Sequence, residues 1–292
     1  MSHGARQNMD YLKKLETRLR SARALSPRVE AETLVAHFTN MKRLDLFTGT
    51  KAISPSERLS IEKALRTRRR GVPLAHVTGQ APFYGRDFQV TKDTLIPRPE
   101  TEILVEETLK FLRARFAGKT VDALDIGTGS GCIALSLTLE YPACRMTALD
   151  ASPKALAVAS KNTESFGLDG RVRLVESRLF ESFGPEKHGF WDVIVSNPPY
   201  VAEEDWEHLS PEVRSEPRLA LDGGKGGLEI VKKILRKAPV FLKPGGRLFI
   251  EIGQGQSVRL AKFLKNNTDL KDLHFVKDLN WVDRVLVAEK HG

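Results

Sequence analysis

The residues Asn197-Pro198-Pro199-Tyr200 combine groups that could hold a planar amino group. Two consecutive prolines fix the backbone and remove two N–H donors, so their carbonyls can only accept hydrogen bonds. The Asn197 side-chain oxygen and the Pro198 carbonyl could each accept one hydrogen of an –NH2 group, on an amide or on a base. The Tyr200 ring could cover its flat face. Such a site would orient a weakly nucleophilic nitrogen towards an electrophile without a general base. The alternative is a polar strand end followed by a simple Pro-Pro turn.

The strand that would carry these residues is the apolar run 191–196. It is short, rich in β-forming residues and closed by prolines, which cannot continue a hydrogen-bonded ladder. Open α/β sheets bind their ligands at the carboxyl ends of the strands. We therefore expect Asn197 to lie at the ligand-binding edge of a sheet.

A second pattern predicts a nucleotide-type cofactor. An apolar strand at 121–126 leads into a glycine-rich turn and then a helix, an arrangement whose backbone can approach a ligand closely. The turn consists of Gly127, Thr128, Gly129, Ser130 and Gly131. Its spacing is G-x-G-x-G and differs from the dinucleotide pattern G-x-G-x-x-G. A further strand at 145–149 ends in Asp150, where a carboxylate could accept hydrogen bonds from ribose hydroxyls. Together these features favour an adenosine-bearing cofactor.

Strands and helices alternate along most of the chain, which predicts an α/β fold. Helices are expected at 103–116, 153–166, 228–238 and 258–264, with further strands at 172–176 and 247–252. This order predicts a parallel sheet covered on both faces. The last two β segments, 273–276 and 284–288, are separated by a short loop and should form an antiparallel edge hairpin.

The sequence predicts three regions: a helical bundle over 1–71, a β-hairpin linker over 72–94 and a catalytic domain over 95–292. In the bundle, Ser26-Pro27 is expected to start one helix, and a capping box from Ser54 to Glu57 another. The last helix of the bundle ends in four arginines, Arg66, Arg68, Arg69 and Arg70. They could simply stabilise the helix C-terminus, or they could form a basic docking surface.

Composition bears on the binding partner, the metal content and the cellular location of the protein. The net charge is +9, which suggests an acidic or nucleic-acid-bearing partner. The two cysteines have no metal or redox spacing, and the seven histidines show no metal-ligand spacing, so no metal is expected. There is no apolar run of membrane-spanning length and no export signal in residues 1–10, which predicts a cytoplasmic protein with no membrane association.

Several of these residues resemble the motifs of a known family, the HemK/PrmC enzymes. The glycine-rich turn, Asp150 and Asn197 to Tyr200 together are similar to class I S-adenosylmethionine-dependent N-methyltransferases. Three further segments narrow the resemblance to HemK/PrmC. These are Phe83-Tyr84-Gly85-Arg86-Asp87-Phe88 with Leu95 to Glu102, Glu212 to Gly224, and Asp278 to Arg284. The resemblance covers nearly the whole chain, although the N-terminal bundle matches by size and character only.

The resemblance implies a Rossmann-like, mostly parallel sheet with an antiparallel C-terminal hairpin, preceded by a small helical bundle. It implies S-adenosylmethionine as cofactor, bound by residues 127–131, Asp150 and Asn197, and methylation of a glutamine amide held by Asn197, Pro198, Pro199 and Tyr200. The catalytic residues would be Asn197, Pro198 and Tyr200. The implied substrate is the Gly-Gly-Gln glutamine of peptide-chain release factors, which the bundle helps to bind. We expect a monomer without stable nucleic-acid binding.

One segment departs from the family pattern. Residues 176–180 occupy the place where the family often carries an acidic residue and an aromatic residue beside the adenine. Arg178 stands there and cannot accept a hydrogen bond from the adenine amino group. Leu179 could still cover the adenine ring, and we expect it to contribute to cofactor binding by apolar contact.

Three other functions remain open from the sequence. An adenine-N6 DNA methyltransferase uses a similar Asn-Pro-Pro-Tyr to hold a flipped base, although no second large domain is present here to read DNA. A sister enzyme that methylates a ribosomal-protein glutamine shares the catalytic motif. The third is an RNA- or ribosome-binding protein that has lost the chemistry, against which the intact motifs argue.

Overall fold

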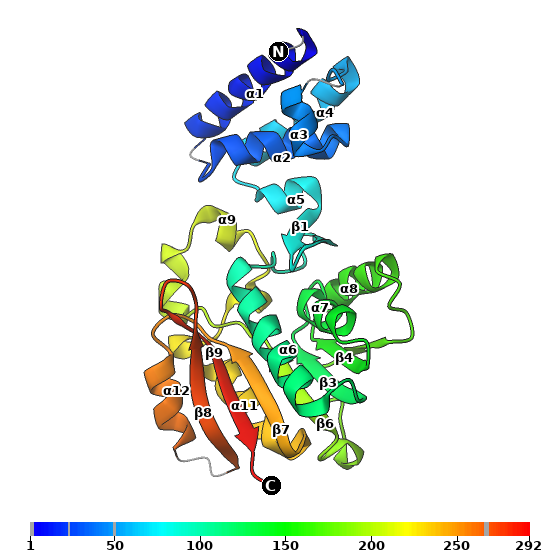
Figure 1. Ribbon diagram of the computed structural model, residues 1–292. Helices are drawn as coiled ribbons and strands as arrows, with labels where there is room; N and C mark the ends of the chain where they lie inside the picture. Colours follow the sequence, from blue (N-terminus) through cyan, green and yellow to red (C-terminus); the bar gives the residue numbers. More distant parts are fainter. Residues whose placement is uncertain (1–2, 23, 49–50, 266–268) are drawn as a thin grey trace. The chain divides into compact units, whose positions relative to one another are not determined.

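The computed structural model describes residues 3–22, 24–48, 51–265 and 269–292 (Figure 1). The chain forms two compact units. Unit 1 consists of Met1–Gly79 with Pro211–Ser215, and unit 2 of Gln80–Ser210 with Glu216–Gly292. No helix in the described ranges is long and apolar enough to cross a membrane.

Unit 1 is helical. Its elements are α1 (His3–Ser21), α2 (Pro27–Thr39), α3 (Arg43–Thr48), α4 (Pro55–Arg69), α5 (Leu74–Thr78) and α9 (Pro211–Arg214). Apolar residues at helical spacing on α1, including Leu12, Leu15 and Leu19, pack with Leu34 of α2 and Leu65 of α4 in one core. The predicted helical bundle is therefore present.

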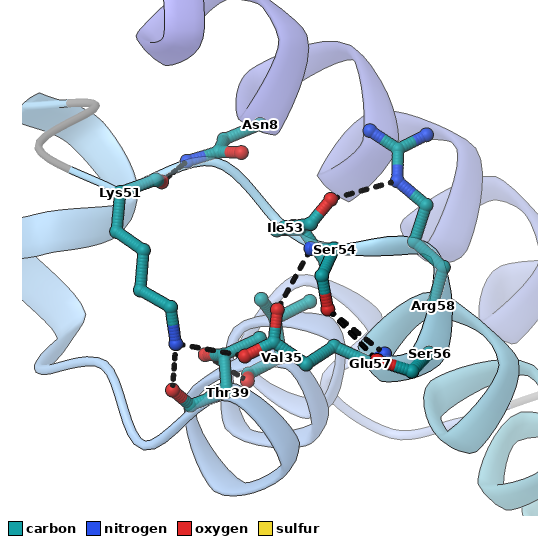
Figure 2. Close-up of polar contacts among 9 residues, drawn as sticks. All are labelled: Asn8, Val35, Thr39, Lys51, Ile53, Ser54, Ser56, Glu57 and Arg58. Carbon is teal, nitrogen blue, oxygen red and sulfur yellow. Dashed lines mark hydrogen bonds and ion pairs between the residues drawn. The ribbon is translucent and has the colours of Figure 1, made fainter.

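The start of α4 carries the predicted capping box (Figure 2). The Ser54 backbone N–H donates to the Glu57 carboxylate at 2.7 Å, and the Glu57 N–H donates to the Ser54 hydroxyl at 3.3 Å. Lys51 Nζ donates to the same carboxylate at 2.7 Å, and these bonds lower the Glu57 pKa to about 2. Ser26 also stands at a helix N-cap as predicted, but its side chain makes no capping bond.

The expected hairpin linker is shorter than the range 72–94. Residues 74–78 form the helix α5 instead, bracketed by Pro73 at its N-cap and by Gly79 in the left-handed conformation at its C-cap. The hairpin itself pairs β1 (Gln80–Phe83) with β2 (Arg86–Gln89). Its two turn residues, Tyr84 and Gly85, both have positive φ, as a tight two-residue hairpin requires.

Unit 2 contains a seven-stranded sheet in the order β5-β4-β3-β6-β7-β9-β8 (Figure 1). Its strands are β3 (Val121–Ile126), β4 (Cys144–Asp150), β5 (Val172–Glu176), β6 (Trp191–Ser196), β7 (Leu242–Glu251), β8 (Leu270–Lys277) and β9 (Asp283–Lys290). Strands β3 to β7 are parallel, whereas β9 runs antiparallel to both neighbours. The α/β fold class and the antiparallel C-terminal hairpin are thus confirmed.

Helices cover both faces of this sheet. They are α6 (Glu102–Phe116), α7 (Cys132–Glu140), α8 (Pro153–Ser165), α11 (Glu229–Phe241) and α12 (Ser257–Leu264). The one-turn helix α10 (Arg218–Leu221) lies in the segment between β6 and β7. Short 3-10 turns are η1 (Pro99–Thr101), η2 (Pro185–Lys187), η3 (Glu203–His208) and η4 (Lys225–Gly227). Alternate strand residues point to opposite faces, so Val193 and Val195 pack in the core with α6 and α7, while Ile194 packs with α11 and α12.

Candidate active site

The predicted cofactor turn lies at the carboxyl end of β3, where the strand order reverses between β4 and β6. Gly127 and Gly129 have φ of 76° and 58°, a conformation that L side chains rarely adopt. No atom outside the neighbouring residues lies within 4 Å of where a Cβ would stand on either glycine. The turn therefore presents bare backbone to open space, as a bound ligand would require.

Asp150 is tied to this turn. Its carboxylate accepts the Gly129 N–H at 2.9 Å and the Ser152 N–H at 2.9 Å. A carboxylate has about four acceptor positions, so it can still accept from a ligand hydroxyl. Burial raises the pKa of Asp150. The predicted pairing of the glycine turn with an acidic residue at the end of β4 is thus seen in space.

Thr128, in the same turn, makes a hydrogen bond within the protein. Its hydroxyl donates to the Asp125 carboxylate at 2.7 Å. Asp125 is fully buried, and burial raises its pKa to about 7. Gly131 begins α7, where an added Cβ would lie 3.2 Å from the Leu135 side chain. The contacts of Thr128 with Asp125 and of Gly131 with Leu135 therefore fix the conformation of the turn on the side that faces the protein core.

Asn162 of α8 holds the turn in place, a role that the sequence did not reveal. Its amide nitrogen donates to the Ser130 carbonyl at 2.8 Å and to the Gln89 carbonyl at 3.0 Å, while its oxygen accepts the Gln89 N–H at 2.8 Å. The side chain is fully buried and all its polar atoms are used. It therefore pins the glycine turn to the β2 strand of the hairpin.

Asn197 follows directly after β6, which is anchored to β3 because the Ser196 hydroxyl donates to the Ile126 carbonyl at 2.7 Å. The Asn197 side-chain nitrogen donates to the Thr101 hydroxyl oxygen at 3.1 Å. The Asn197 oxygen is therefore directed away from Thr101. Among the described residues, none donates a hydrogen bond to this oxygen or to the Pro198 carbonyl, so both acceptors are available on residues that line the cavity.

Tyr200 is held by a glycine segment that packs against its backbone. The Gln256 side-chain nitrogen donates at 3.0 Å to the Tyr200 carbonyl and at 3.0 Å to the Gly227 carbonyl. An added Cβ on Gly227 would lie 2.1 Å from the backbone carbonyl oxygen of Tyr200, and one on Gly223 would lie 2.8 Å from the Tyr200 Cα. These glycines thus allow close backbone approach. Burial raises the pKa of Tyr200, so its hydroxyl stays protonated.

Most of the predicted site residues line one cavity of about 210 Å³. Its wall includes Gly127, Gly129, Asp150, Leu179, Asn197, Pro198 and Pro199. Thr128, Ser130, Gly131 and Tyr200 are not part of this wall. The first three belong to the glycine turn but do not line the cavity, and Tyr200 is half-buried, with its backbone carbonyl bound by Gln256.

The segment before α6, residues 95–101, is fixed by side-chain contacts. Arg98 forms an ion pair with the buried Glu216, which also accepts the Ile96 N–H at 2.9 Å. Glu102 accepts the Tyr84 N–H at 2.7 Å. The segment is thereby fixed so that Thr101 reaches Asn197. Arg178 and Leu179 both line the cavity, with Leu179 in the left-handed region at φ 54°.

The fold and the cavity define a class I S-adenosylmethionine-dependent methyltransferase. Residues 101–212 match the methyltransferase small domain family, and residues 10–79 match the PrmC N-terminal domain family. The crystal structure of a methyltransferase from Pyrococcus furiosus has the same fold, with a TM-score of 0.51 at 20% identity over 82% of this chain and 100% of that chain.

Curated relatives specify the family. The release factor glutamine methyltransferase of Geobacter sulfurreducens is 40% identical over 89% of this chain and 88% of its own length. That of Cereibacter sphaeroides is 42% identical over 81% of each chain. The chain belongs to the release factor glutamine methyltransferase family, which confirms the resemblance found in the sequence.

The cofactor of this enzyme is S-adenosylmethionine. The residues present fit such a group, because two glycines leave open space beside bare backbone and a carboxylate stands at the end of the next strand. Among the residues described, no cluster of metal-ligating side chains occurs.

Proposed function

We propose that the protein transfers a methyl group from S-adenosylmethionine to the side-chain amide nitrogen of the glutamine in the Gly-Gly-Gln motif of peptide-chain release factors. The name of the curated relatives supports this substrate. The orientation of Asn197 is the structural observation that carries the proposal. Its nitrogen is engaged by Thr101, so its oxygen and the Pro198 carbonyl form a pair of acceptors that fits the two hydrogens of a carboxamide.

In the proposed reaction the Asn197 oxygen and the Pro198 carbonyl hold the glutamine –NH2 in line with the donor. The cofactor supplies an electrophilic methyl carbon on a positively charged sulfur. Transfer would form the N–C bond as the S–C bond breaks, leaving a neutral thioether on the donor, and the methylated nitrogen would then lose one proton to water. Two acceptors oriented in advance favour the pyramidal nitrogen that develops during transfer. Tyr200 packs on the glutamine side chain, and Leu179 on the adenine.

The proposed donor site uses the glycine turn and Asp150. The backbone at Gly127 and Gly129 would approach the cofactor closely, and the Asp150 carboxylate would accept from its ribose hydroxyls. Thr128, Ser130 and Gly131 contribute by fixing the shape of the turn. Asn197 lies at the meeting point of donor and acceptor sites, because it shares the cavity wall with both.

We assign the helical residues 1–71 to recognition of the release factor, residues 72–94 to the connection and residues 95–292 to catalysis. Arg66, Arg69 and Arg70 at the end of α4 are exposed, which supports a basic surface for an acidic partner. Arg68 is instead buried between two carboxylates and belongs to the core of unit 1. We further propose that the enzyme acts in the cytoplasm as a monomer, without stable nucleic-acid binding.

The proposal is tested by incubating the protein with S-adenosylmethionine and a purified release factor, followed by mass spectrometry of the Gly-Gly-Gln peptide. We expect a mass increase of one methyl group on the glutamine. A ribosomal protein and an adenine-containing oligonucleotide are assayed in parallel. Methylation of either of these in place of the release factor would overturn the proposed substrate.

A prediction for the donor site concerns Gly129. We expect Gly129→Ala to weaken S-adenosylmethionine binding by about tenfold, or ~1.4 kcal/mol, because the methyl group enters the open space beside the turn. Isothermal titration calorimetry measures the change. The matched control is Gly118→Ala, since Gly118 also has positive φ and open space beside it but lies outside the cavity. Equal binding loss in both variants would contradict the assignment of the turn.

A further inference from the structure

Glu251, at the end of β7, is a buried carboxyl group that the proposed reaction does not use. Its residue is 1% exposed, and its Oε2 atom has no hydrogen-bonding partner among the residues described. Because Ser196 pairs with Ile250 in the parallel β6–β7 ladder, Glu251 is level with Asn197. A buried carboxyl group with an unused oxygen is costly, so its place beside the site calls for a reason.

Thr101 connects this carboxyl group to Asn197. The Thr101 hydroxyl has one hydrogen, and its oxygen accepts the Asn197 N–H at 3.1 Å. The same hydroxyl interacts with Glu251 and stabilises its charged form. An ionised carboxylate can only accept, so Thr101 directs its hydrogen to Glu251 and its oxygen to Asn197. This polarity allows only the amide nitrogen of Asn197 to face Thr101.

Glu251 also interacts with the second half of the site, the Tyr200 hydroxyl. Tyr200 comes three residues after Asn197, so Glu251 interacts with one end of the Asn-Pro-Pro-Tyr segment directly and with the other end through Thr101. Arg284 of β9 is near Glu251, but its Nε donates to Asp278 at 2.9 Å, so its charge is shared with another carboxylate. A simple ion pair therefore does not account for Glu251.

We infer that Glu251 is a positioning residue: through the Thr101 hydroxyl it fixes which atom of the Asn197 amide faces the substrate, and it holds the Tyr200 hydroxyl. This inference rests on the proposed function, since it assigns the orientation of the acceptor pair that holds the glutamine amide. With Glu251 ionised, the Asn197 oxygen is presented. With Glu251 neutral, its proton can be donated to Thr101, which can then donate to Asn197 and favour the reversed amide.

The inference predicts a pH dependence. Burial raises the pKa of Glu251 to about 7, although Thr101, Arg284 and Tyr200 act in the opposite direction. Glu100 also faces the group and raises its pKa, and the buried Cys132 thiol lies nearby. Because the ionised form is the productive one, turnover should fall as the pH decreases through about 7.

The experiment compares Glu251→Gln and Thr101→Val with the wild-type enzyme, using full-length protein and release factor. We expect each variant to lower kcat by about tenfold, the loss of roughly one oriented hydrogen bond, while the Kd for S-adenosylmethionine stays unchanged. The acidic limb of the kcat profile near pH 7 should disappear in Glu251→Gln. Thr101→Ser should restore kcat, because it keeps the hydroxyl. Glu289→Gln on β9 is the control for a strand carboxylate outside the site.

Wild-type turnover in Glu251→Gln and Thr101→Val, or an unchanged acidic limb in Glu251→Gln, would overturn the inference. If Glu251→Gln fails to fold, Thr101→Val decides alone, because it removes the connection and leaves the buried carboxyl group in place. Absence of methylation by the wild-type enzyme would instead overturn the proposed function. The two failures are therefore distinguishable in one series of assays.

Discussion

Replacing Asn197 with alanine is expected to lower turnover by about a hundred- to a thousandfold, the loss typical of one preorganised polar contact. The physical reason is the pair of acceptors at the cavity rim. Without the Asn197 oxygen only the Pro198 carbonyl remains to hold the glutamine –NH2, so the nitrogen is no longer kept in line with the methyl carbon. Steady-state kinetics with release factor measures the effect.

Cofactor affinity separates this role from a general defect. Because the proposed donor site also includes Gly127, Gly129 and Asp150, the Kd for S-adenosylmethionine should change much less than turnover. Asn280→Ala is the matched control, since its side chain is exposed on the β8–β9 loop. Near-normal turnover of Asn197→Ala would remove the central role assigned to this residue.

The second large effect is expected on stability, from Arg68→Ala. Arg68 is 5% exposed and pairs with Glu30 at 2.6 Å and with Glu212 at 2.7 Å, which joins α4, α2 and α9 within unit 1. Removing the guanidinium leaves Glu30 buried without a cation. Breaking a buried ion pair in this way costs about 3 kcal/mol or more of unfolding free energy. Hydrogen exchange of the α2 and α4 amides measures the loss.

Two comparisons test this explanation. The neighbouring Arg69 is exposed, so Arg69→Ala removes the same charge without leaving a buried carboxylate, and it should change stability by less than about 0.5 kcal/mol. The double variant Arg68→Met with Glu30→Leu should recover most of the loss, since a well-packed apolar pair can replace a buried ion pair. If Arg68→Ala and Arg69→Ala behave alike, the buried pair does not stabilise unit 1.

Several parts of the molecule could be predicted from the sequence because short-range interactions determine them. The capping box from Ser54 to Glu57 depends on residues three apart, and strand alternation depends on neighbours two apart. The glycine turn at 127–131 requires backbone conformations that its own residues permit. The same local pattern placed Asn197 at the end of a strand. The hairpin was misjudged at 74–78, where Pro73 and Gly79 bracket a short helix.

Only the tertiary structure decided which long-range partners complete the site. Thr101 is 96 residues from Asn197, and Asn162 is 32 residues from the turn it holds. Arg68 stands among four arginines of one helix end, yet it alone of the four is buried, against a carboxylate 144 residues away. Such contacts arise when packing closes long loops, and no spacing in a single chain encodes them. The sequence determined which residues could hold an amide, and packing decided how the Asn197 side chain is oriented.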